Sequence, residues 1–160
     1  MLDNIYYNII LYVQAMKVYF TTSQRGKGYF DQYYIRIYNE IKRLGHTHLD
    51  DEIVKVTSKE FYNELEEGGS ESYKKLYKSN IKNLHSSDIN FFEVSIHSLS
   101  VGFMINKSIE INKPTIALYL KGNNPLFLSG IEGDKFIILR YCESNLERIV
   151  KESLEKAKKL

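Results

Sequence analysis

Cysteine and tryptophan are almost absent from this chain of 160 residues, which has one cysteine, Cys142, and no tryptophan. A single cysteine excludes an intramolecular disulfide and is typical of a reducing compartment, so we expect a cytoplasmic protein. The four histidines are scattered and, with one cysteine, show no spacing that would hold a metal. We therefore expect neither a metal nor any other cofactor.

The chain also lacks a strong charge of either sign and a long apolar run. Its formal net charge of +2 is too small to indicate binding to nucleic acid or to an anionic membrane. The apolar segment at residues 1–15 contains Asp3, has no basic N-terminal region, and is too short to span a bilayer. We expect no signal peptide here and interpret residues 1–15 as an extension of a domain that spans residues 16–160.

What the chain does have is the composition of one globular domain, with 43% hydrophobic and 26% charged residues. Short β-branched and aromatic runs alternate with segments whose apolar residues recur every three or four positions, which predicts alternating strands and helices. The expected strands cover 17–23, 47–54, 89–95, 115–120 and 135–141, and the expected helices cover 30–44, 72–87, 100–112 and 145–160, with a helix plus a mobile loop over 58–72. The fold class is therefore α/β: a single-domain, doubly wound, mostly parallel sheet with helices on both faces.

Three loops rich in hydroxyl groups and glycine follow the expected strands, at the edge where parallel sheets bind ligands. They contain TTSQRG after the first strand, HSLSVG before a helix, and LSGIEG before the last strand. Hydroxyl groups, exposed amides and the guanidinium of Arg25 suit an anion such as phosphate. Each loop taken alone is more often a helix cap or a turn, so the interpretation depends on the position that they share.

Five short motifs occur in a fixed order: VYFTTSQRG, the pair Asp88 and Glu93-Val94, SLSVGF, the helix ending NKP, and LSGIEG. In this order they resemble the 2'-deoxynucleoside 5'-phosphate N-hydrolases of the nucleoside 2-deoxyribosyltransferase superfamily, over about residues 16–142. The resemblance implies a doubly wound sheet, a homodimer, and cleavage of the N-glycosidic bond of deoxynucleoside monophosphates or transfer of their sugar.

The resemblance also implies roles for residues of these motifs. Serines of the three loops are expected to bind the 5'-phosphate, the last of them in the site of the neighbouring subunit, and Tyr19 is expected near the reacting sugar. The expected phosphate-binding residues are Ser23, Gln24, Arg25, Gly26, Ser98 and Ser129. The expected neighbours of the sugar and base are Tyr19, Gly102 and Glu93.

Two acids of the family pattern are missing. Met104 replaces the nucleophilic glutamate, which attacks or stabilises the anomeric carbon, and Asn80 replaces the assisting aspartate of the preceding helix. Methionine cannot form a glycosyl ester, and asparagine cannot give a proton to the leaving base. Thr22 also replaces a turn glycine, and Glu52 makes the region of the base pocket more acidic. The resemblance therefore predicts a site with no intact catalytic residue.

Three hypotheses follow. The first is a protein that binds nucleoside 5'-monophosphates with impaired or absent N-glycosidase activity, as a homodimer or together with an active paralogue. The second is an active hydrolase or transferase in which another acid, Asp50 or Asp51, replaces the missing ones. The third is a non-catalytic interaction protein that docks through residues 1–15. Base preference, and the choice between ribose and deoxyribose, stay open at this point.

Overall fold

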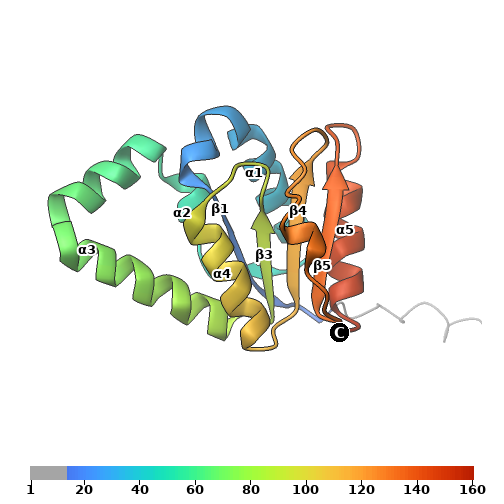
Figure 1. Ribbon diagram of the computed structural model, residues 1–160. Helices are drawn as coiled ribbons and strands as arrows, with labels where there is room; N and C mark the ends of the chain where they lie inside the picture. Colours follow the sequence, from blue (N-terminus) through green and yellow to red (C-terminus); the bar gives the residue numbers. More distant parts are fainter. Residues whose placement is uncertain (1–13) are drawn as a thin grey trace, which may run out of the picture.

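The computed structural model describes residues 14–160 as one sheet with helices packed around it (Figure 1). The strands are β1 (Lys17–Thr22), β2 (Thr47–His48), β3 (Ile89–Glu93), β4 (Thr115–Leu120) and β5 (Phe136–Tyr141). The α-helices are α1 (Lys27–Arg43), α2 (Glu52–Lys55), α3 (Ser58–Ser86), α4 (Leu99–Glu110) and α5 (Leu146–Ala157), with short 3₁₀ helices η1 (Gln24–Gly26) and η2 (Leu128–Gly130). The proposed N-terminal extension lies almost wholly in residues 1–13, outside the described residues.

All five described strands pair in parallel, in the order β2-β1-β3-β4-β5. This confirms the expected α/β fold with a doubly wound parallel sheet. The chain moves outward from β1 to β2, crosses back past β1 to β3, and continues to β4 and β5. The direction of winding therefore reverses between β1 and β3, and the loops after two such strands leave a crevice between them.

One face of the sheet is covered by α1 and α5 and has an apolar core (Figure 1). Val18, Phe20 and Phe91 point to this face from alternate positions of their strands, and each is at most 1% exposed. They belong to one buried cluster with Ile37 of α1 and Leu154 of α5. Burial of this apolar surface is the main stabilising contribution on this face.

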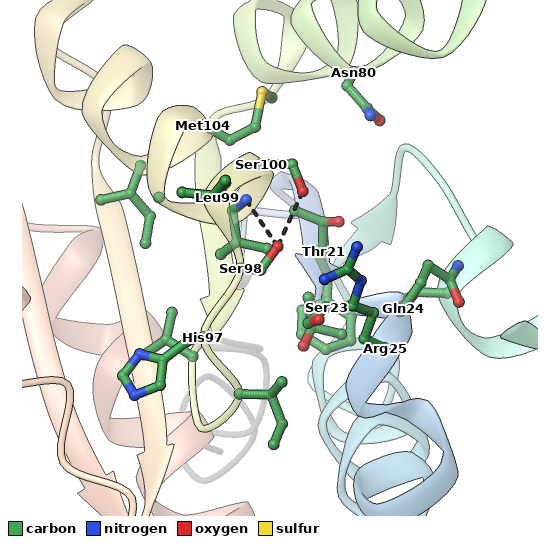
Figure 2. A pocket seen from close by; sticks show the side chains of 18 of the residues that line it. Thr21, Ser23, Gln24, Arg25, Asn80, His97, Ser98, Leu99, Ser100 and Met104 are labelled. Carbon is green, nitrogen blue, oxygen red and sulfur yellow. Dashed lines mark hydrogen bonds between the residues drawn. The ribbon is translucent and has the colours of Figure 1, made fainter. Parts of the chain in front are cut away.

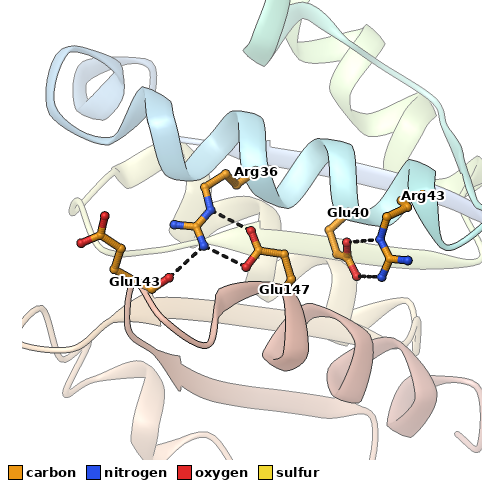
Figure 3. A network of polar contacts seen from close by, with 5 residues as sticks. All are labelled: Arg36, Glu40, Arg43, Glu143 and Glu147. Atoms are coloured by element: carbon orange, nitrogen blue, oxygen red, sulfur yellow. Dashed lines mark hydrogen bonds and ion pairs between the residues drawn. The ribbon is translucent and has the colours of Figure 1, made fainter.

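Two arginines of α1 each form a bidentate ion pair (Figure 3). Arg36 donates to both carboxylate oxygens of Glu147 in α5, at 2.7 and 2.8 Å, and to the backbone carbonyl of Glu143 at 2.8 Å. Glu40, which is 4% exposed, accepts two hydrogen bonds of 2.6 Å from Arg43, three residues later on the same helix. The hydrogen bonds from Arg36 lower the pKa of the Glu147 carboxyl. The bidentate pair of Arg36 with Glu147 adds a polar contact between α1 and α5 at the edge of their apolar interface.

The opposite face is covered by α3 and α4 and has a smaller core. Tyr19, Phe92 and Ala117 point to it from the strands, and Ile105 of α4 packs on them. In α3 only Leu84 is buried, so most of this long helix makes few core contacts. The face is thus well packed near the end of α3 and more open elsewhere.

A buried polar network joins the elements of this face. The side-chain amide of Asn90 donates to the Ser108 hydroxyl at 2.8 Å and to the carbonyl of Leu84 at 3.2 Å, and its oxygen accepts from the Ser87 hydroxyl at 2.8 Å. Ser108 also shares a 2.6 Å hydrogen bond with Thr115. Asn90, Ser108 and Thr115 are fully buried, so these bonds satisfy groups that water cannot reach. They tie α3, α4, β3 and β4 together.

Helix α3 departs from the expected secondary structure. In place of a helix followed by a mobile loop, two helical arms meet at a kink at Gly69, where φ is 53° and ψ is −141°. Glycine takes this conformation easily because it has no Cβ atom. The first arm begins with a capping box, in which Thr57 and Glu60 each bond the other's backbone amide. Among residues 14–160, no helix has both the length and the apolar composition needed to cross a membrane.

The expected strand over residues 47–54 was also wrong for most of its length. Only Thr47 and His48 pair with β1, and the short helix α2 then begins at Glu52. The Asp50 side chain accepts a 2.7 Å hydrogen bond from the backbone amide of Glu52, which turns the chain away from the sheet. This turn brings Asp50 and Glu52 toward the carboxyl end of β1.

Candidate functional site

A cavity of about 720 Å³ opens at the carboxyl ends of β1 and β3, where the direction of winding reverses. The loops after these strands, the first half of α4 and the segment 125–128 form part of its wall. Phe61, Leu65 and Leu76 supply an apolar wall from both arms of α3. The volume falls in the range of about 300–1,000 Å³ that is usual for small-molecule sites.

Polar groups suited to an anion gather on one side of this cavity (Figure 2). One set lies at the end of β1 and just after it, the other follows β3, and these two strands are neighbours in the sheet. The Ser58 hydroxyl donates to the carbonyl of Gln24 at 2.6 Å, so the start of α3 holds the first loop in place. The polar residues on this side are Thr21, Ser23, Gln24, Arg25, Ser98 and Ser100. His97 also lines the cavity, but its ring is directed away from this group (Figure 2).

Helix α4 begins at this polar side. Ser98 is its N-cap, with its hydroxyl 3.4 Å from the amide of Val101 and 3.0 Å from the hydroxyl of Ser100 (Figure 2). The first amides of a helix have no partner within it, and the helix dipole places partial positive charge at this end. With the guanidinium of Arg25, this side of the cavity offers both hydrogen-bond donors and positive charge to an anion.

Met104 lies in the cavity wall further along α4, and its side chain points toward the part of α3 that carries Asn80 (Figure 2). Met104 is 6% exposed and packs in the core cluster of this face. The hydroxyl of Tyr19 donates to the Asn80 oxygen at 2.9 Å. Burial raises the pKa of Tyr19 well above its usual value, so its hydroxyl stays protonated and acts as a donor. This region therefore holds a thioether, an amide and a neutral phenol, and none of them is an acid at neutral pH.

Two carboxylates line the cavity near this group. Asp50 and Glu52 both belong to the wall, and their charges further raise the pKa of Tyr19. Burial raises the pKa of Glu52, and the nearby Asp50 adds to the effect. Asp51 is not part of the wall, and its carboxylate forms an ion pair with Lys55. The cavity thus has an acidic part as well as a part whose polar groups suit an anion.

Three of the expected site residues do not line the cavity. Gly26 lies in η1, and its amide donates to the carbonyl of Ser23 at 3.0 Å. A Cβ atom at Gly26 would clash with the hydroxyl of Tyr34 and lie 2.8 Å from Ile96, so glycine allows this close packing. Ser129 lies on η2, where its hydroxyl donates to the carbonyl of Pro125 at 3.3 Å.

Glu93 is the third of these residues, and it points to the face covered by α1 and α5. It is 1% exposed and accepts hydrogen bonds from the Tyr141 hydroxyl at 3.0 Å and from the hydroxyl and amide of Ser95. Burial raises the pKa of Glu93 to about 7, although these hydrogen bonds act in the opposite direction. Since Ser95 also accepts from the amide of Leu120 at 2.7 Å, Glu93 fixes the start of the loop that leads to Ser98.

The remaining expected residues lie together around the cavity. Tyr19, Asn80, Gly102 and Met104 line the cavity along with the polar loops. The sequence did not indicate the apolar wall from α3, and it pointed to His97 and Ser100 only as members of the loop HSLSVG. The spacing of Phe61 and Leu65, four residues apart, is the one local signal for that wall, because it places both side chains on one helix face.

Neither a search of the described residues for metal ligands nor a comparison with known proteins identifies a ligand for this cavity. Within residues 14–160 no group of three or more His, Cys, Asp or Glu side chains is placed to hold a metal ion. Comparison of the chain with protein-family models and with curated proteins finds no match.

Proposed function

We propose that this protein binds nucleoside 5'-monophosphates in the cavity at β1 and β3 and has impaired or absent N-glycosidase activity. The observation that supports this best is the polarity of the cavity wall. Ser23, Arg25 and Ser98 gather at one side, together with the start of α4, and Met104 occupies the helix position expected for a nucleophilic acid. A phosphate is the natural occupant of the first side, and the apolar wall from α3 suits a flat base.

The proposed loss of activity follows from the chemistry of Met104 and Asn80. Cleavage of an N-glycosidic bond develops positive charge on the sugar, which a carboxylate stabilises or attacks. A buried thioether supplies no charge, and the oxygen of Asn80 is already an acceptor for Tyr19. General acid or base help alone is worth about 10²–10⁴-fold in rate, so loss of both acids leaves little of this mechanism.

Calorimetric titration with deoxynucleoside and ribonucleoside monophosphates tests the binding proposal. We expect saturable binding of at least one monophosphate, and binding weakened about tenfold by Ser23→Ala or Arg25→Ala, because each removes a phosphate donor. Ser70→Ala, at an exposed position outside the cavity, is the matched control and should leave the affinity unchanged. The corresponding nucleosides should bind the variants and the native protein equally. Absence of binding by every monophosphate would overturn the proposal.

A second candidate function is an active hydrolase or transferase that uses another acid. The position of Asp50 in the cavity wall, beside the pair formed by Tyr19 and Asn80, favours it, whereas Asp51 lies outside the wall. Release of free base from each monophosphate distinguishes the two candidates. Turnover that is lost in Asp50→Asn and kept in Met104→Ala would support the second candidate. Under the first, only the double variant Met104→Glu with Asn80→Asp should gain base release.

We also propose that the protein acts as a homodimer, with Ser129 near the site of the neighbouring subunit. Large apolar side chains at the cavity mouth are unusually exposed: Leu99 by 95%, Leu126 by 80% and Phe127 by 91%. Such a group of apolar side chains is typical of an interface. Sedimentation analysis should show a dimer that Phe127→Ser weakens, and a monomer at all concentrations would contradict this proposal.

A further inference from the structure

The cavity continues into a recess of about 180 Å³ that lies away from its anion-binding side. Asp50, Glu52 and Asn80 line both spaces, so they stand where the main cavity meets the recess. The recess also has apolar walls from Phe61 and Leu65 of α3. A ligand whose phosphate lies at the start of α4 would therefore extend its other end toward these three polar side chains.

Asp50 is held firmly by the protein itself. One of its carboxylate oxygens accepts from the amide of Glu52 at 2.7 Å, and the other accepts from the side-chain amide of Asn83 at 3.3 Å. Asn83 lies three residues after Asn80, and side chains at this spacing share one face of a helix. Asp50 is thus placed next to Asn80, with both of its oxygens already engaged.

The carboxylate of Glu52 is placed differently. Within residues 14–160 it accepts no hydrogen bond and forms no ion pair, although it is only partly exposed. The side chains around it include the acids Asp50 and Glu64, and the cation among the recess residues is Lys75, which is exposed on α3. Since the carboxylate oxygens of Glu52 reach the open cavity and no side chain in the described part of the chain engages them, they can accept a hydrogen bond from a ligand that donates one.

We infer that Glu52 determines base specificity by accepting a hydrogen bond from an exocyclic amino group of the bound base. This inference rests on the proposed nucleotide-binding function. Cytosine, adenine and guanine carry such an amino group, whereas uracil, thymine and hypoxanthine present a carbonyl oxygen or a hydrogen at the corresponding position. A carbonyl oxygen facing Glu52 would place two acceptors against each other. The site therefore selects nucleotides with amino-substituted bases.

The pair dCMP and dUMP gives the sharpest test. The two nucleotides differ only in that the amino group and unprotonated ring nitrogen of cytosine are a carbonyl oxygen and a protonated ring nitrogen in uracil. Calorimetric titration should show dCMP binding the native protein about tenfold more tightly than dUMP, as expected for one well-placed hydrogen bond to a charged group. The pair dGMP and dIMP should show the same order. In Glu52→Gln the preference for dCMP should fall to about twofold or less, because the amide can also donate to the carbonyl oxygen of dUMP. The preference for dGMP over dIMP should fall as well, because a neutral amide oxygen accepts a weaker hydrogen bond than a carboxylate does.

Asp51→Asn is the matched control, since it makes the same change of charge one residue earlier but alters a side chain outside the cavity. It should leave the preference for dCMP intact. Glu52→Ala serves as a second variant if Glu52→Gln unfolds, and the comparison of dCMP with dUMP in the native protein needs no variant.

The outcomes separate this inference from the function on which it rests. Equal affinity for dCMP and dUMP in the native protein overturns the role of Glu52 and leaves nucleotide binding in place. A preference for dCMP over dUMP that persists in both Glu52→Gln and Glu52→Ala also overturns the role of Glu52 and leaves nucleotide binding in place. Failure of every monophosphate to bind overturns both proposals.

Discussion

The two faces of the sheet are built in different ways. The face under α1 and α5 has a large apolar core, and one of its buried polar groups, Glu93, lies at the carboxyl end of β3. The face under α3 and α4 has a smaller core, and its polar network around Asn90 lies at the opposite end of the strands. The cavity occupies the part of this second face where apolar packing is least complete.

The difference shows how one small domain can be both stable and open. The first face has the larger buried apolar cluster and therefore the larger share of the hydrophobic stabilisation, so the second face can leave part of its core open. On the second face, hydrogen bonds hold α3 and α4 at one end and leave the other end apart. A ligand site can exist there without loss of the fold.

The largest expected effect compares core positions on the two faces. Ile37→Ala, at a fully buried position of α1, should lower the unfolding free energy by about 4 kcal/mol, because it leaves a cavity in close-packed surroundings. Leu76→Ala, at a partly exposed position of α3 that lines the ligand cavity, should lower it by about 1 kcal/mol or less. Urea denaturation of both variants measures this. Equal losses of unfolding free energy in the two variants would mean that the two faces contribute equally to stability.

The buried carboxyl of the first face should make stability depend on pH. Since the pKa of Glu93 is raised to about 7 in the folded protein, the folded state keeps a proton that the unfolded chain loses near pH 4. The stabilisation is full below pH 4 and decreases as the pH rises to about 7, by about 3 kcal/mol in total. Glu93→Gln should remove this part of the slope. Unfolding curves from pH 4 to 8 with an unchanged slope would contradict the assignment.

The polar network of the second face gives a smaller effect. Asn90→Ala should lower the unfolding free energy by about 2 kcal/mol, because it leaves the buried hydroxyls of Ser87 and Ser108 with fewer partners. Asn39→Ala, at an exposed position of α1, is the control and should change stability by about 0.5 kcal/mol or less. Faster hydrogen exchange in α4 than in α1 of the Asn90 variant would further support a local role for this network.

The smallest effect concerns two glycines close together in sequence. Gly26→Ala should destabilise the protein by about 1–2 kcal/mol, because the added Cβ atom meets Tyr34 and Ile96. Gly28→Ala, in the first turn of α1 with no atom within 4 Å of the added Cβ, should be neutral or slightly stabilising. Thermal unfolding of the pair measures the difference. Equal melting temperatures would show that η1 can shift to accommodate the added Cβ atom without loss of stability.

Much of this architecture was predictable from local sequence. Strands such as β4, TIALYL, are β-branched and apolar, and α4 has its cap at Ser98 and its apolar positions at helical spacing. The polar loops after β1 and β3 were predictable too, since parallel strands bring their carboxyl ends to one edge. These signals lie within a few residues of one another, which is why the sequence alone reveals them.

What the sequence could not reveal depends on distant partners. The surroundings of Glu93 include Tyr141, 48 residues away, and nothing local marks Glu93 as facing α1 and not the cavity. The placement of Glu52 depends on the turn at Asp50 and on the packing of α3 over it. Two adjacent glycines, Gly68 and Gly69, suggested a loop, because a kink and a loop have the same local composition.

The kink at Gly69 has a mechanical consequence. The arm before it carries Phe61 and Leu65, the arm after it carries Leu76 and Asn80, and both arms border the same cavity. The dihedral angles of Gly69 therefore contribute to the width of the cavity on this side, together with the contacts that anchor the two ends of α3. A ligand that contacts both arms therefore spans the kink at Gly69. The length of such a ligand would affect the angle between the two arms of α3.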